Sequence, residues 1–142
     1  MNLAKKLATV ALLASSLVFT GCGQDKIGSV DVDKVMAEAP RVKTLMSEAE
    51  GKIKEAQDKF QKDYGDKELS EEDAVKVQME FQRKLESINQ GYASQIRSRM
   101  DVVINEIAQE KDISVVLSNS KDDKMIFQGA VDITDDVIKK MQ

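Results

Sequence analysis

The sequence predicts an α+β protein in which a long antiparallel helical hairpin stands on a small β-sheet. Two successive long stretches carry apolar residues at heptad spacing, a glycine-containing break separates them, and three short β-branched stretches lie outside them. Charged residues make up 32% of the chain and aromatic residues only 4%. That balance favours long solvated helices over a large globular core.

The first 21 residues have the pattern of a secretory signal. Lys5 and Lys6 precede the apolar run Leu7 to Phe19, and the small residues Thr20 and Gly21 close it. A helix over this run would span about 20 Å, which is shorter than the roughly 30 Å hydrocarbon core of a bilayer. We therefore expect residues 1–21 to be a cleaved signal peptide and not a permanent membrane span.

The only cysteine, Cys22, follows directly in the stretch VFTGC. This stretch matches the lipobox of bacterial lipoproteins, in which small residues let the signal peptidase cut before a cysteine that carries a diacylglycerol. Residues 22–26 are then a lipidated lead that anchors the chain to a membrane. An ordinary cleaved signal with a spare cysteine is the alternative. Gly23 after the cysteine favours the outer membrane over the inner membrane.

The composition after the signal excludes several classes of chemistry. The chain has no histidine, so the commonest general base and the imidazole metal ligand are missing, and a single cysteine forms no intramolecular disulfide. Without Lys5 and Lys6, 19 basic side chains face 25 acidic ones, a net charge of −6 that gives no reason to expect nucleic acid. We expect no enzyme, no metal site and no cofactor.

The first half of the chain after the signal predicts a strand, a short helix and the first helix of the hairpin. The residues Ile27 to Val32 are β-branched and predict a strand, and a short helix follows it. Pro40 is suited to the first turn of a long helix that runs to Tyr64, because proline there loses no hydrogen bond. The second long helix, from residue 71 to about residue 109, begins after a break at Gly65 with Ser70 as its N-cap.

The apolar residues of the two long helices predict a common seam. If the chain reverses at Gly65, facing residues have numbers that sum to about 134, which places Phe60 opposite Ala74 and Ile53 opposite Phe81. Alanines then face bulkier residues, as interdigitated helices require. The predicted hairpin seam comprises Val42, Met46, Ile53, Phe60, Val77, Phe81, Leu85, Ile88 and Tyr92.

The second long helix keeps an apolar stripe after Tyr92, where the first helix has ended, so something else must cover it. The candidates are strands at residues 113–118 and 125–130 and a last short helix with Thr134 as its N-cap. Three short strands leave two open sheet edges, which assembly with copies of the chain would hide. We therefore predict a hairpin over 40–92 and a body of 27–39 with 93–142.

Three apolar residues lie off the predicted seam. Leu45, Val75 and Met79 are candidates for adaptable contacts with a bound polypeptide, and scattered surface residues are the alternative. Gly91 indicates either a bend between hairpin and body or a close contact between helices.

The order of these elements resembles the Skp/OmpH family of envelope chaperones. The resemblance covers nearly the whole chain after the signal and is most specific at the start, VDVDKVMAEAPRVKTLM, and at the finish, VDITDDVIKKM. It implies a homotrimer that pools its strands into a small β-barrel, from which three helical hairpins project. It also implies an ATP-independent holdase for unfolded outer-membrane proteins. Members are often strongly basic, whereas this chain is acidic.

Together these features predict a lipid-anchored chaperone on the periplasmic face of the envelope. The alternative is a structural coiled-coil lipoprotein that spaces or tethers envelope layers and holds no clients. The two share the anchor and the assembly, so only their binding partners separate them.

Overall fold

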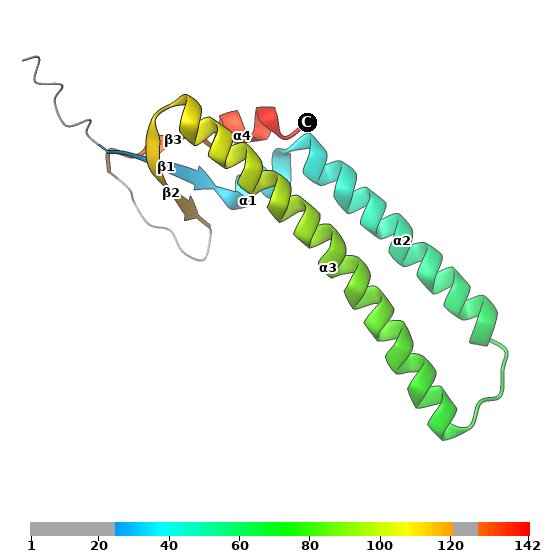
Figure 1. The fold of residues 1–142 in the computed structure, drawn as a ribbon. Coiled ribbons are helices and arrows are strands. Elements are labelled where there is room, and N and C mark those ends of the chain that lie inside the picture. Colours follow the sequence, from blue (N-terminus) through cyan, green and yellow to red (C-terminus); the bar gives the residue numbers. More distant parts are fainter. Residues whose placement is uncertain (1–24, 121–127) are drawn as a thin grey trace, which may run out of the picture.

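The structure, a computed structural model, describes residues 25–120 and 128–142. Cys22 and the predicted signal therefore lie outside the described residues, as do residues 125–127 of the predicted third strand. In chain order the elements are β1 (Lys26–Asp31), α1 (Val32–Glu38), α2 (Pro40–Tyr64), α3 (Glu71–Glu110), β2 (Ile113–Asn119), β3 (Val131–Asp132) and α4 (Thr134–Lys140). Figure 1 shows α2 and α3 as a long hairpin that projects from a body of sheet and short helices. The mixed, helix-rich fold with a small sheet is as predicted.

The sheet has the strand order β2-β1-β3, and both neighbours run parallel to the central strand β1. Gly28 in β1 pairs with Val116 in β2. A Cβ atom at Gly28 would lie 3.1 Å from the Ile113 side chain, so glycine permits the close approach of these strands. The outer edges of β2 and β3 have no further strand among the described residues.

The described part of the predicted third strand, residues 128–130, is not strand. Residues 128–129 form a turn, and β3 begins at Val131. Gly129 has a φ of 91°, a left-handed conformation that turns the chain and that glycine adopts without strain. The predicted strand took the apolar run Met125 to Phe127 as its signal and passed over the turn that Gly129 makes.

The core lies in the body, where α1, the last part of α3 and α4 contact the sheet. The apolar stripe of α3 beyond Tyr92 is covered there, as its sequence required. Its residues Val103 and Ile107 are 0% and 1% exposed. The other buried apolar residues of the core are Val30, Val35, Ala39, Val42, Leu45, Ile96, Ile113, Ile133, Val137 and Met141.

The ends of the two long helices follow the sequence signals. Pro40 opens α2, and the Arg41 N–H, left free by the missing side-chain cap, donates to the Met141 carbonyl at 3.1 Å. The Ser70 hydroxyl oxygen accepts from the Asp73 N–H at 3.2 Å and so caps α3. The predicted boundaries at Pro40, Tyr64 and Ser70 are thus confirmed.

The cap of α4 differs from the prediction. Thr134 is the first helical residue and not the N-cap, because the Asp132 carboxylate accepts from its N–H at 2.9 Å. The buried Thr134 hydroxyl donates to Asp132 at 2.6 Å and accepts from the Asp31 N–H at 2.9 Å. One hydroxyl therefore joins the end of β1 to the start of α4.

Candidate functional site on the hairpin and the open sheet

The outer half of the hairpin is held by a cluster of aromatic rings. Phe60 of α2 stacks on Phe81 of α3 with ring centroids 4.3 Å apart, and the Tyr64 ring lies 5.5 Å from Phe60. The Lys67 ammonium lies 5.3 Å from the Tyr64 ring centre, a cation–π distance. The cluster thus ties both helices and the connecting loop together.

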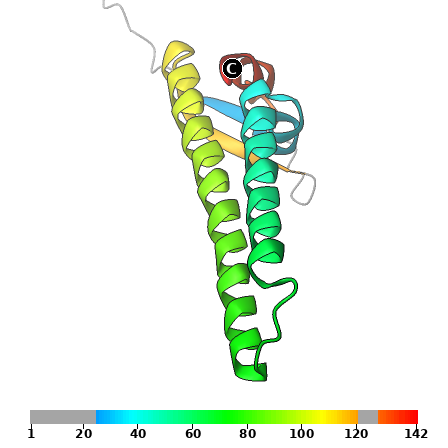
Figure 2. The ribbon, with the colours of Figure 1, turned by 90° about the vertical axis from the view of Figure 1, so that its right-hand side faces the viewer.

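The stacking of Phe60 on Phe81 corrects the predicted register. Facing residues have numbers that sum to 141 and not to about 134, so Phe60 does not face Ala74, and Ile53 does not face Phe81. The loop of residues 65–70 runs along the hairpin axis before α3 begins, as Figures 1 and 2 show, instead of reversing the chain at once. The shift is one heptad, and a heptad pattern looks the same after such a shift.

The burial along α2 corrects two further assignments. Val42 is fully buried, and the predicted seam residues from Ile53 to Tyr92 are partly buried. Met46, however, is 43% exposed, whereas Leu45 is 2% exposed and packs in the core. At its base α2 packs on the body as well as on α3, which turns its buried face toward Leu45. Leu45 is therefore a seam residue and not a surface for clients, and Met46 is not part of the seam.

Val75 and Met79 both lie on the surface of α3, with 60% and 51% of their area exposed. They precede the inward-facing residues Val77 and Phe81 by two positions each, so they lie about 200° around the helix and face away from α2. The structure thus leaves them free to contact another polypeptide, and their role in client binding stays a prediction.

The sheet presents a second apolar surface. Ile27 and Val115 are paired across β1 and β2, and they are 44% and 51% exposed. The start of β1 and residues 128–131 line a shallow cavity of about 390 Å³ beside them. Among residues 25–120 and 128–142, nothing therefore covers this face of the small sheet or pairs with its two edges.

A groove of about 580 Å³ lies where α1, α3 and β2 meet. Met36 of α1 and Met100 and Ile104 of α3 contribute apolar walls, and Arg97 and Asp101 also line it. Sequence reasoning did not place Met36 or Ile104 in a surface, because the groove joins elements that are distant in the chain. The spacing of Met100 and Ile104 on one helix face was the available signal.

Exposed ion pairs join α4 to its neighbours. Lys34 of α1 donates to Asp135 of α4 at 2.8 Å, which raises the pKa of Lys34 and lowers the pKa of Asp135. Lys140 lies 2.6 Å from Glu110 and 3.1 Å from Glu106 of α3, and hydrogen bonds to both raise its pKa. These pairs are solvated, so they orient α4 more than they stabilise it.

Two further features are absent from the described residues. Residues 25–120 and 128–142 contain no group of three acidic or cysteine side chains placed to hold a metal ion. Within the same residues no helix is both long and apolar enough to cross a membrane. What remains is a charged hairpin, a few exposed apolar residues and an open sheet.

These features define a class of protein, a small α+β body that carries one long two-helix arm. A model of the outer membrane protein (OmpH-like) family matches residues 66–141, which is more than half of the chain. The chain therefore belongs to the OmpH-like family, and the resemblance seen in its sequence is confirmed. No curated protein matches the chain.

The OmpH-like family is periplasmic and is associated with chaperone activity. Its members bind outer-membrane protein clients and form trimers. The match covers α3, the sheet strands β2 and β3, and α4, so it includes the exposed residues Val75 and Met79.

Proposed function

We propose that this protein is an ATP-independent holdase that binds unfolded outer-membrane proteins in the bacterial envelope and catalyses no reaction. The observation that carries the proposal is the projecting hairpin of α2 and α3 on an open-edged sheet in a chain of the OmpH-like family. A long solvated arm offers a large surface to an extended client without the enclosed pocket that a small ligand needs.

Trimerisation into a β-barrel body is part of the proposal. It is supported by the open edges of β2 and β3, by exposed Ile27 and Val115, and by the apolar groove beside Met36 and Met100. Sheet edges and apolar faces of this kind are seldom left open, because they pair with other chains. Three hairpins on one barrel would surround a space for a client.

Lipidation of Cys22 completes the proposal. Ile27 is five positions after Cys22, a reach of at most about 18 Å, so the body would lie close to the bilayer. A single acyl chain binds a membrane reversibly, but a trimer carries three multiply acylated ends and would stay bound. We propose the periplasmic face of the outer membrane as its place.

Light scattering tests the holdase function. A urea-unfolded outer-membrane β-barrel protein is diluted into buffer with and without the purified protein, at one trimer per client. We expect the aggregation to be suppressed without ATP. Aggregation that is unchanged at equimolar trimer would overturn the proposed function.

A structural lipoprotein that spaces or tethers envelope layers is the second candidate. It is favoured by the charged outer surface of the hairpin, where exposed ion pairs join Lys52 with Glu55 and Lys59 with Asp63. Affinity capture from solubilised membranes separates the two functions. A spread of nascent outer-membrane proteins supports the chaperone, whereas peptidoglycan or one constant partner supports the spacer.

A further inference from the structure

The start of α3 has no helix beside it. The register set by Phe60 and Phe81 places residues 71–76 of α3 opposite the connecting loop and beyond the end of α2 at Tyr64. Figure 2 shows α3 continuing past the end of α2 at the end of the hairpin that is farthest from the body. We call residues 65–80, the loop and the first turns of α3, the tip.

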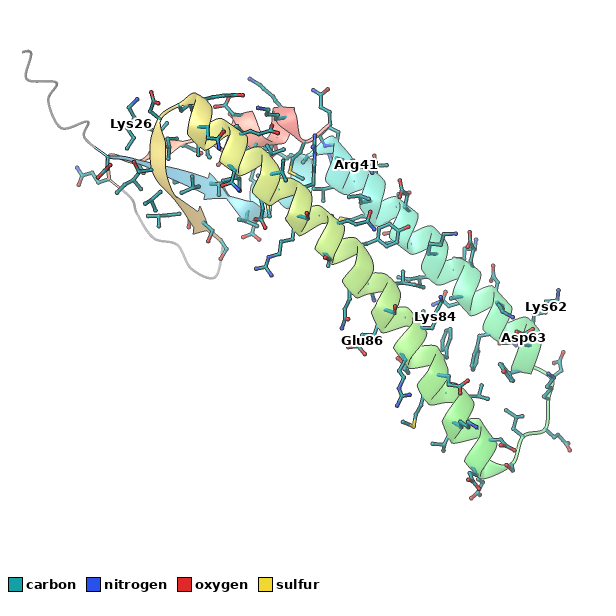
Figure 3. All side chains as sticks on the ribbon, in the orientation of Figure 1. Lys26, Arg41, Lys62, Asp63, Lys84 and Glu86 are labelled. Atoms are coloured by element: carbon teal, nitrogen blue, oxygen red, sulfur yellow. The ribbon has the colours of Figure 1, made fainter. Side chains whose placement is uncertain are left out.

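The tip carries an apolar surface on the side away from α2. Val75 and Met79 stand one turn apart and expose 60% and 51% of their area. Glu86 lies seven residues after Met79 and so shares its face, and Figure 3 shows Glu86 on the side of α3 away from α2. A methionine in such a place adapts to partners of different shape.

The charge of the tip is opposite to that of the rest of the hairpin. The tip has six acidic and two basic side chains, a net charge of −4, whereas residues 40–64 and 81–92 have eight basic and six acidic ones, a net charge of +2. Within the described residues, none of the six acidic groups of the tip lies in an ion pair. In contrast, Lys52 pairs with Glu55, and Lys59 pairs with Asp63.

The unpaired carboxylates border the apolar surface. Glu71 and Glu72 lie four and three residues before Val75, on the same side of the helix. Lys76 and Arg83 lie beside Met79, so the negative charge is strongest at the free end of the hairpin. Three acidic residues in the first turn exceed the half unit of positive charge at a helix N-terminus.

We propose that the tip docks basic amphipathic segments of unfolded polypeptides, with Val75 and Met79 on the apolar side of the segment and Glu71 and Glu72 on its cations. The inference rests on the proposed function and names a class of client segment for it. The charge complementarity selects this occupant, since an anionic bilayer or an acidic segment meets repulsion from the unpaired carboxylates.

Fluorescence anisotropy with two peptides tests the proposal. One is a labelled amphipathic peptide of leucine and lysine, and the other has glutamate at every lysine. The purified full chain is expected to bind the basic peptide about tenfold more tightly, a difference of about 1.4 kcal/mol, and added salt should reduce this preference. Equal affinities, or binding to phosphatidylglycerol vesicles through the tip, would overturn it.

Variants locate the binding. Val75→Ser with Met79→Ser should weaken binding of the basic peptide about tenfold, and Glu71→Gln with Glu72→Gln should remove most of the preference and its salt dependence. Val102→Ser is the matched control, because Val102 is 45% exposed on the same helix outside the tip. Unchanged binding in both tip variants would overturn the inference. Circular dichroism verifies that each variant keeps its helices.

The aggregation assay distinguishes this inference from the proposed function. If the wild-type chain does not suppress aggregation, the holdase function fails, yet a tip-dependent preference for the basic peptide still supports docking at the tip. If the chain suppresses aggregation but both peptides bind equally, the holdase stands and the docking inference fails.

Discussion

The body and the hairpin bury their apolar residues to very different extents. In the body, Val35, Val103 and Val137 are fully buried among several elements. In the hairpin from Met46 to Gln95, the described seam residues are only partly buried, since two helices leave both sides of their contact open to water. The hairpin therefore depends on the body for stability, and we expect its free end to open most readily.

The largest expected effect is in the body. Ile107→Ala removes a side chain that is 1% exposed and should lower the free energy of unfolding by about 2 to 5 kcal/mol. Val102→Ala, on the same helix but 45% exposed, is the control and should change it by less than about 0.5 kcal/mol. Urea unfolding followed by circular dichroism measures both. Similar losses would mean that the body core is not where the structure places it.

The next effect tests the hairpin register. Phe60→Ala and Phe81→Ala remove the two stacked rings, and their double-mutant cycle should give a coupling of about 0.5 to 1.5 kcal/mol. The matched cycle of Ile53→Ala with Phe81→Ala should give a coupling near zero. Strong coupling in the second cycle and none in the first would restore the register with Ile53 opposite Phe81.

A smaller effect, with opposite sign, is expected at two helical glycines. Apart from the local helix backbone, no described atom lies within 4 Å of a Cβ placed on Gly51 or Gly91, so no close contact with another described element of the chain explains Gly91. Gly51→Ala and Gly91→Ala should each stabilise the hairpin by about 0.5 to 1 kcal/mol. Gly28→Ala is the control and should destabilise the sheet. Hydrogen exchange of the hairpin amides reports the change, and faster exchange in either helical variant would contradict it.

The smallest effect is a dependence on acid at the ion pairs. The hydrogen bond from Lys34 lowers the pKa of Asp135 below its ordinary value of 3.8. The ionised carboxylate therefore stabilises the folded body at pH values above 3.8, and this stabilisation is lost as the pH falls through the lower pKa of the folded state. Asp135→Asn should reduce the acid sensitivity of the body below about pH 3.8. Asp63→Asn removes a pair within α2 and should affect only the hairpin. Thermal melts across this pH range compare the two variants. An equal change in the acid sensitivity of the body in both variants would contradict the role of the pair between Lys34 and Asp135.

The local features of the fold were predictable because their signals are local. Pro40 and Ser70 mark helix starts by their own chemistry, and the 3-4 spacing from Ile53 to Phe60 marks the seam. The register was not predictable, because a heptad repeat fits its partner equally well after a shift of seven residues. Only the path of the loop after Tyr64 decides between the two.

The candidate site was predictable in part. Val75 and Met79 stand out as apolar residues off the seam, and the structure leaves both exposed. Leu45 has the same pattern but is buried, because the body covers that side of α2, and contacts between distant elements leave no mark on local spacing. The prediction for Cys22 rests on its own sequence context and lies outside the described residues.

The most direct test of the account compares the wild-type chain with Phe81→Asp in the aggregation assay. The substitution places a charge against the Phe60 ring and should disorder the hairpin while the body keeps its fold. The account predicts that the wild-type protein suppresses aggregation of an unfolded outer-membrane β-barrel and that the variant, with reduced helicity, does not. Equal suppression by a variant with a disordered hairpin would contradict the claim that the hairpin holds the client.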